Sequence, residues 1–266
     1  MSRLSVWVFT KILTQSLKRN SKDRLKRYGS PYGGWTICQC VDHFSNQGIF
    51  ISAGVGEDIS FDTELLKVSS LLAVLVDPTD RAETHVKNYL SASEQLMEPV
   101  YSDTGNQPIA SYFSTEDIKK RMKMIKKALW IDNNGIDLYP PLTTSHVSYR
   151  LTNTAGGKKS ARRFPSIDLT TIVTQIEIDE ILSCEPKVVV LKMDIEGSEY
   201  SVIVNLTKNM IRPKQLLVEL DFMREKNPYL QSLRLYSLLR IIKKHHYRLA
   251  HIEKLNCLFL DMSTSS

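Results

Sequence analysis

Short apolar runs alternate with amphipathic stretches along most of the chain from residue 48 onward. Each run is rich in Val, Ile, Leu or Phe and ends at glycine, proline or acidic residues, as buried strands do. The runs that predict strands are 48–52, 71–76, 136–139, 188–193, 215–221, 247–253 and 255–261. The stretches that predict helices run from the turn after Gly56 through Leu66, then cover about 85–96, 116–127, 169–182, 198 onward and 230–244.

This alternation predicts an α/β fold. Strands that are apolar on both faces and alternate with helices indicate a Rossmann-like, mostly parallel sheet with helices on both faces. The last two strands are joined by a tight turn, which predicts an antiparallel C-terminal hairpin at one edge. We place one large domain at 41–266. Residues 1–40 are predicted as an N-terminal helical extension, because LSVWVFTKILTQSLKR is amphipathic and the turn-rich YGSPYGGW follows it.

Targeting signals and cysteines favour a cytoplasmic protein. The N-terminal stretch has no uninterrupted apolar core and no small-residue cleavage site, so a signal peptide is not predicted. No apolar run reaches the roughly 18 residues of a membrane span. The four cysteines form no zinc-type CxxC pair and are expected to be thiols in a reducing compartment. The N-terminal helix is expected to cover the domain or to make a peripheral membrane contact.

The net charge of +6 is concentrated locally. Six basic residues lie between Lys119 and Lys127, and four more between Lys158 and Arg163. Such clusters can meet phosphate, an anionic membrane surface or an acidic substrate, or they can be solvated faces. No aromatic residues are interleaved with them, so nucleic acid is not expected as a partner.

Two strand ends predict a nucleoside site. The first strand of the domain is followed by the turn Gly54-Val55-Gly56-Glu57-Asp58, whose glycines permit close backbone approach to a ligand. The next strand ends in Asp77-Pro78, and Asp77 follows Gly54 by 23 residues, where a carboxylate can accept hydrogen bonds from a ribose diol. The alternative is a structural turn followed by a helix-capping aspartate.

The charge of the turn predicts which cofactor it holds. A dinucleotide fingerprint needs a third glycine, and position 59 is Ile59 with Asp58 beside it. An acidic helix start repels a pyrophosphate but tolerates the sulfonium and amino groups of S-adenosylmethionine. The chain contains neither a Tyr-x-x-x-Lys pair nor a GxxxxGK[ST] phosphate loop. These features predict methyl transfer.

The strand 188–193 ends in KMDIEG, with Asp194, Glu196 and Gly197. We expect this strand beside the first strand of the domain, which brings the acids to the reactive end of the cofactor. A carboxylate there can hold the cofactor's amino acid part, bind a metal or take a proton from a hydroxyl. Glu219 and Asp221 end a further strand at the same edge, which favours chemistry over helix capping. Asp194 is predicted as the base, alone or through a divalent metal shared with Glu219, and Glu196 as a turn or cofactor residue.

Several segments, in their order, resemble the FkbM family of S-adenosylmethionine-dependent methyltransferases. They are ISAGVGEDISFDTEL (51–65), VDPT (76–79), LYPPLTTSHVSYRLTN (138–153), LTTIV (169–173), LKMDIEGSEYSVI (191–203) and LLVELDF (216–222). The resemblance implies the seven-stranded methyltransferase sheet and O-methylation of a hydroxyl on a small molecule, often a sugar or a polyketide-like product.

The resemblance also implies roles for single residues. Gly54, Val55, Gly56, Glu57, Asp58, Asp77, Pro78 and Glu196 would bind the cofactor. His146, in the family-like HVSYR, would be a base, a substrate contact or a structural histidine. Many methyltransferases outside the family have an acid before the first glycine and a third glycine; here those places are Ser52 and Asp58, which leaves the contacts to the methionine end of the cofactor open.

Two other functions compete with this one. The first is a nucleic-acid methyltransferase that uses the basic helix. Amino-directed enzymes of that kind carry (Asp/Asn)-Pro-Pro-(Tyr/Phe) where this chain has Asp194-Ile195-Glu196-Gly197, and Asn227-Pro228-Tyr229 follows the wrong strand. The second is a protein that binds the cofactor without catalysis, which a fold alone does not exclude.

Overall fold

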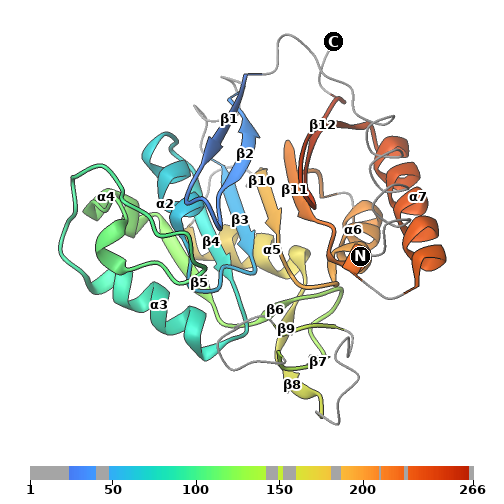
Figure 1. Cartoon of the computed structure of the whole chain (residues 1–266), viewed down its shortest axis with the longest axis horizontal. Helices are drawn as coiled ribbons and strands as arrows, with labels where there is room; N and C mark the ends of the chain where they lie inside the picture. Colours follow the sequence, from blue (N-terminus) through green and yellow to red (C-terminus); the bar gives the residue numbers. More distant parts are fainter. Residues whose placement is uncertain are drawn as a thin grey trace.

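In the computed structural model of the chain, the described residues are 24–39, 48–141, 149–151, 160–180, 187–209, 211–224 and 227–263. Their centre is a seven-stranded sheet with the order β12-β13-β11-β10-β3-β4-β5 (Figure 1). The strands are β3 (Ile49–Ala53), β4 (Leu72–Val76), β5 (Met122–Ile125), β10 (Val188–Met193), β11 (Gln215–Glu219), β12 (Tyr247–Glu253) and β13 (Asn256–Asp261). The predicted α/β class is confirmed.

Most of the sheet is parallel. Four pairs of neighbouring strands are parallel: β3 with β4, β3 with β10, β4 with β5, and β10 with β11. β13 is antiparallel to both of its neighbours, β11 and β12, so it alone runs against the other six strands. The carboxyl ends of β3, β4, β10 and β11 therefore meet at one edge, as the sequence predicts for β3 and β10.

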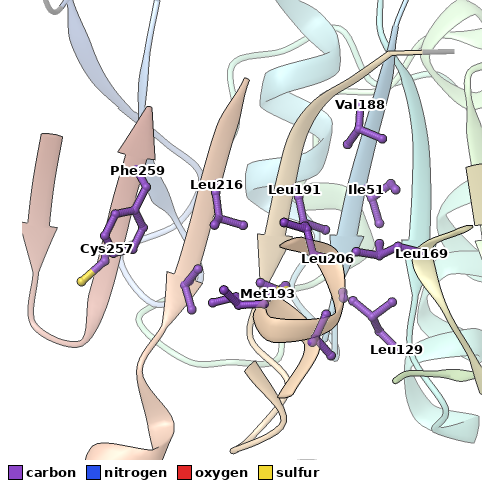
Figure 2. Close-up of a cluster of buried hydrophobic side chains, with 14 of the residues drawn as sticks. Ile51, Leu129, Leu169, Val188, Leu191, Met193, Leu206, Leu216, Cys257 and Phe259 are labelled. Atoms are coloured by element: carbon purple, nitrogen blue, oxygen red, sulfur yellow. The ribbon is translucent and has the colours of Figure 1, made fainter. Parts of the chain in front are cut away.

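Alternate side chains of each central strand enter two different cores. In β3, Ile49, Ile51 and Ala53 belong to the core that also contains residues of α5 (Leu169–Glu180), α6 (Glu199–Lys208) and α7 (Pro228–Lys244). Phe50 points to the opposite face and packs with α2 (Ser60–Lys67) and α3 (Asp80–Ser91). Figure 2 shows the first core, in which Leu206 and Leu169 cover the strand residues Leu191, Met193 and Ile51. Burial on both faces explains why these strands are almost wholly apolar.

Residues 25–38 form a β hairpin. Its strands are β1 (Leu25–Tyr28) and β2 (Trp35–Cys38), and their buried side chains join the core around α2. The backbone of Cys38 exchanges two hydrogen bonds with the Gln215 side chain, of 2.8 and 2.7 Å. These residues lie in the range predicted as a helical extension; alternating burial against the domain makes them strands instead. Residues 1–23, including the predicted N-terminal helix, lie outside the described residues.

The basic stretch 116–127 is not one helix. α4 covers Glu116–Lys120 only, and β5 then pairs with β4 at the sheet edge, because pairing outweighs the local helical pattern. The Arg121 guanidinium donates to the carbonyls of Leu66, Ser69 and Leu71 at 2.9 to 3.0 Å. The Lys126 amine pairs with Asp80 and Glu83. Much of this charge therefore serves the fold.

Two small sheets complete the described structure. They pair β6 (Ala128–Leu129) with β9 (Ser166–Ile167), and β7 (Ile136–Leu138) with β8 (Arg162–Phe164). Short 3₁₀ turns lie at Ile109–Ser111 and Asp221–Arg224. Within the described ranges, no helix has the length and apolar character to cross a bilayer. Cys38 is disulfide-bonded, which corrects the expectation of four thiols, and Cys257 is a buried free thiol.

Candidate functional site

A cavity of about 830 Å³ opens where the carboxyl ends of β3, β4, β10 and β11 meet. All of the described residues predicted for catalysis or cofactor binding line it. They are Gly54, Val55, Gly56, Glu57, Asp58, Asp77, Pro78, Asp194, Glu196 and Glu219. His146 lies outside the described residues. The structure thus brings together residues from four separate segments of the sequence.

The glycine turn after β3 is fixed against both neighbouring strand ends. Gly54 has a φ of +75°, and a Cβ at this position would lie 1.7 Å from the Asp194 carbonyl oxygen. The Gly54 N–H donates to the Val76 carbonyl at 2.9 Å, and the Asp194 N–H donates to the Ala53 carbonyl at 3.0 Å. Gly56 also has a positive φ, of +55°, but the space where its Cβ would lie is open. Gly54 therefore serves chain packing, whereas Gly56 leaves room beside the turn.

The Asp77 carboxylate joins β4 to this turn. Its Oδ1 accepts hydrogen bonds from the N–H (2.9 Å) and the hydroxyl (2.7 Å) of Thr79, and its Oδ2 accepts one from the Gly56 N–H (3.1 Å). Burial raises the pKa of this carboxyl, while the bonds from Thr79 and Gly56 act in the opposite direction. Both lone pairs of Oδ1 are used, so Oδ2 keeps the acceptor position for a ribose hydroxyl.

Asp58 and Glu57 hold neighbouring segments in place. The Asp58 carboxylate accepts the Ser30 hydroxyl at 2.6 Å and the Ser60 N–H at 3.0 Å, which ties the turn of the β1–β2 hairpin to the start of α2. Glu57 forms an ion pair with Arg81 of α3. Both acids line the cavity, and both are already bound to protein groups. They therefore fix the position of the cavity wall.

Three carboxylates lie close together at the ends of β10 and β11. One oxygen from each of Asp194, Glu219 and Asp221 lies within 4.8 Å of the others. Glu219 is the last residue of β11, and Asp221 begins the 3₁₀ turn that follows. Carboxylate oxygens at such spacing suit a divalent cation, and their mutual repulsion favours a bound positive charge of any kind.

Residues 149–151 contact the turn after β10. Arg150 Nη2 lies 2.5 Å from an oxygen of Glu196 and 3.8 Å from one of Asp221. The Leu151 N–H donates to the Glu196 carbonyl at 3.2 Å, and Tyr149 lines the cavity. Glu196 has a φ of +54° and Gly197 one of +101°, so the chain turns sharply here, as the sequence predicts for Gly197. Arg150 compensates part of the negative charge at the site.

Glu199 fixes the same turn from within α6. Its fully buried carboxylate accepts hydrogen bonds from the backbone N–H groups of Ile195 and Gly197, at 3.0 to 3.2 Å. Burial raises the pKa of Glu199 to about 8, although these hydrogen bonds act in the opposite direction. Sequence reasoning missed Glu199, because an acid in the first turn of a helix is ordinary capping chemistry.

Three further residues that were not predicted from the sequence line the cavity: Tyr32, Trp35 and Lys192. Lys192 is buried, and its amine donates to the Gly54 carbonyl at 3.2 Å. A Cβ at Gly105 would lie 2.5 Å from the Tyr32 ring, so the hairpin turn and the loop at 103–106 touch across one side of the cavity. The one available signal was Lys192 itself, a charged residue in an otherwise apolar strand.

Comparison with known proteins gives one match. A family model described as "Methyltransferase FkbM domain" matches residues 45–249, which span β3 through all of α7 and the start of β12. The match includes every described site residue above except those of the β1–β2 hairpin and its turn. No curated protein and no solved structure matches the chain.

Proposed function

The chain belongs to the FkbM methyltransferase family, and we propose that it transfers a methyl group from S-adenosylmethionine to a hydroxyl of a small molecule or sugar. The observation that carries the proposal is the meeting of the glycine turn after β3 with Asp194 and Glu219, at the ends of β10 and β11, at one cavity. A cofactor bound along the turn would place its reactive end beside a carboxylate.

The cavity suits the chemistry of this cofactor. The space beside Gly56 is open, and Asp77 Oδ2 retains an acceptor position for a ribose hydroxyl. The cavity also carries far more acidic than basic side chains, which favours the positive sulfonium and amino groups over the pyrophosphate of a dinucleotide.

Asp194 is proposed as the general base. Bound S-adenosylmethionine supplies an electrophilic methyl group on a sulfonium. Asp194 accepts the proton of the acceptor hydroxyl as the new C–O bond forms and the C–S bond breaks, which leaves a methyl ether, S-adenosylhomocysteine and a protonated Asp194. A neutral alcohol is a weak nucleophile, and a positioned base contributes about 10²- to 10⁴-fold to the rate. Arg150 and Glu199 hold the turn that carries this carboxylate.

A second version of the site uses a divalent metal. Asp194, Glu219 and Asp221 would be its ligands, and the metal would lower the pKa of a bound acceptor hydroxyl. The two versions differ in one observable. Turnover that survives exhaustive chelation favours Asp194 as the direct base, whereas turnover that is lost on chelation and restored by one divalent cation favours the metal.

Calorimetry with S-adenosylhomocysteine and NAD tests the cofactor assignment. We expect S-adenosylhomocysteine to bind and NAD not to bind. Binding of NAD alone would contradict the proposal. Tight binding of S-adenosylhomocysteine with no methyl transfer to any of a panel of hydroxyl acceptors would favour a non-catalytic binding module.

A further inference from the structure

Lys192 is a buried cation in the cavity wall that the proposed mechanism does not use. It lies in β10, in register with Ser52 of β3, and is 3% exposed. Its ammonium lies 5.8 Å from the centre of the Trp35 ring and donates one hydrogen bond, to the Gly54 carbonyl at the glycine turn. An ammonium has three donors, so two can serve a ligand in the cavity.

A charge is buried only where something compensates it. Asp62 of α2 is fully buried, and burial raises the pKa of its carboxyl, whereas the charge of Lys192 and the Ser52 hydroxyl act in the opposite direction. Of these two side chains, Lys192 lines the cavity and Asp62 does not, so an anion bound in the cavity can compensate the buried ammonium.

Lys192 is the cation that a bound anion would meet at this turn. The other described basic residues in the cavity wall are Arg27 and Lys254. Arg27 donates to the Ser30 carbonyl at 2.7 Å and to the Pro31 carbonyl at 3.1 Å, and Lys254 is exposed. The many acids of the wall would repel an anion elsewhere in the cavity.

We propose that the Lys192 ammonium binds the carboxylate of the methionine part of S-adenosylmethionine. This inference rests on the proposed function. The methionine part carries a carboxylate and an amino group; Lys192 takes the first, and Glu196 takes the second. The zwitterion is thereby oriented along the cavity side of the turn, with the sulfonium facing the cavity beside the Asp194 carboxylate.

A thermodynamic cycle tests the proposal. One ligand is S-adenosylhomocysteine, and the other is its decarboxylated analogue, which keeps the amino group and lacks only the carboxylate. Both are titrated calorimetrically into the wild type, Lys192→Met and the matched control Lys254→Met. We expect Lys192→Met to weaken the binding of S-adenosylhomocysteine at least about tenfold and the binding of the analogue less than twofold. Lys254→Met should leave the affinity for both ligands unchanged.

The outcomes are distinct. Failure of the wild type to bind S-adenosylhomocysteine contradicts the proposed function itself. Wild-type binding with an equal loss for both ligands in Lys192→Met, or with no loss, overturns the role of Lys192 and leaves the function standing. Lys192→Gln repeats the cycle if Lys192→Met does not fold. If neither variant folds, the wild type decides: equal affinity for the two ligands overturns the proposal, and at least tenfold weaker binding of the analogue supports it.

Discussion

A Cβ on residue 54 would lie 1.7 Å from the carbonyl oxygen of Asp194, so the glycine turn after β3 and the acidic turn after β10 are packed in direct backbone contact. This contact joins the two halves of the candidate site, the cofactor turn and the acid that acts on the acceptor. A change at either turn therefore affects both.

Gly54→Ala is expected to destabilise the fold by at least about 3 kcal/mol, because it adds a steric clash to an unfavourable φ. Gly56→Ala is the matched control: it has a similar φ but open space, so we expect a loss of about 1 kcal/mol. The methyl group of Gly56→Ala would instead occupy the cavity and weaken the binding of S-adenosylhomocysteine. Urea unfolding and calorimetry measure the two effects. Equal stability losses in the two variants would contradict the contact.

Asp77→Ala should weaken S-adenosylhomocysteine at least about tenfold, or roughly 1.4 kcal/mol, because the ribose loses its acceptor and the Gly56 N–H loses its partner. Thr79→Val separates the role of Asp77 in cofactor binding from its role in fixing the turn after β4. It removes the Thr79 hydroxyl from Oδ1 and leaves Oδ2 intact, so stability should fall while affinity is retained. An unchanged dissociation constant in Asp77→Ala would remove Asp77 from the site.

Glu199 should make stability depend on pH. The pKa of Glu199 is raised from an ordinary value near 4.5 to about 8, because the folded protein holds the proton more tightly than the unfolded chain. This proton therefore contributes fully to the free energy of unfolding below pH 4.5, and the contribution is lost as the pH rises through 8. From pH 6 to pH 7.5 the free energy of unfolding of the wild type should fall by about 2 kcal/mol relative to that of Glu199→Gln. Glutamine keeps the shape of the protonated acid and does not titrate. The measurement is urea unfolding of both proteins across this range. Parallel curves would show that Glu199 does not titrate there.

The basic stretch at 119–127 should stabilise the fold and not bind nucleic acid. Arg121→Ala should cost about 1.5 to 3 kcal/mol, because three backbone carbonyls lose their donor. The exposed neighbour Lys120 is the control, and Lys120→Ala should be nearly neutral. Electrophoretic shift with RNA and DNA at moderate salt should show no complex. Salt-sensitive binding that is lost when this stretch is neutralised would revive the nucleic-acid alternative.

The sequence predicted the strands and their acidic ends well, because a buried parallel strand is a local apolar run and a turn residue closes it. The strand β5 was missed: MKMI lies inside a lysine-rich helical pattern, and only its pairing with β4 makes it a strand. The hairpin at 25–38 was missed for the same reason, since its burial comes from contacts with α2 and with Gln215.

The predicted site was incomplete where its contacts join distant segments. Asp221 was recognised as an acid at a strand end, but its approach to Asp194 within 4.8 Å depends on the register of β10 and β11. Arg150 reaches Glu196 from 46 residues away in sequence, and no local pattern marks such a contact. The roles of Asp194 and Glu219 in catalysis, and of His146, stay predictions.

Asp194 is proposed to take the hydroxyl proton, so turnover of Asp194→Asn measures whether its charge is needed for methyl transfer. Asparagine keeps the size and most hydrogen bonds of the side chain and removes its charge. With an acceptor identified with the wild type, we expect Asp194→Asn to keep the wild-type melting temperature and an affinity for S-adenosylhomocysteine within about threefold, while the rate of methyl transfer falls at least about 10²-fold. Near-normal turnover in a folded, cofactor-binding Asp194→Asn would contradict the claim, and loss of folding would show that Asp194 is structural.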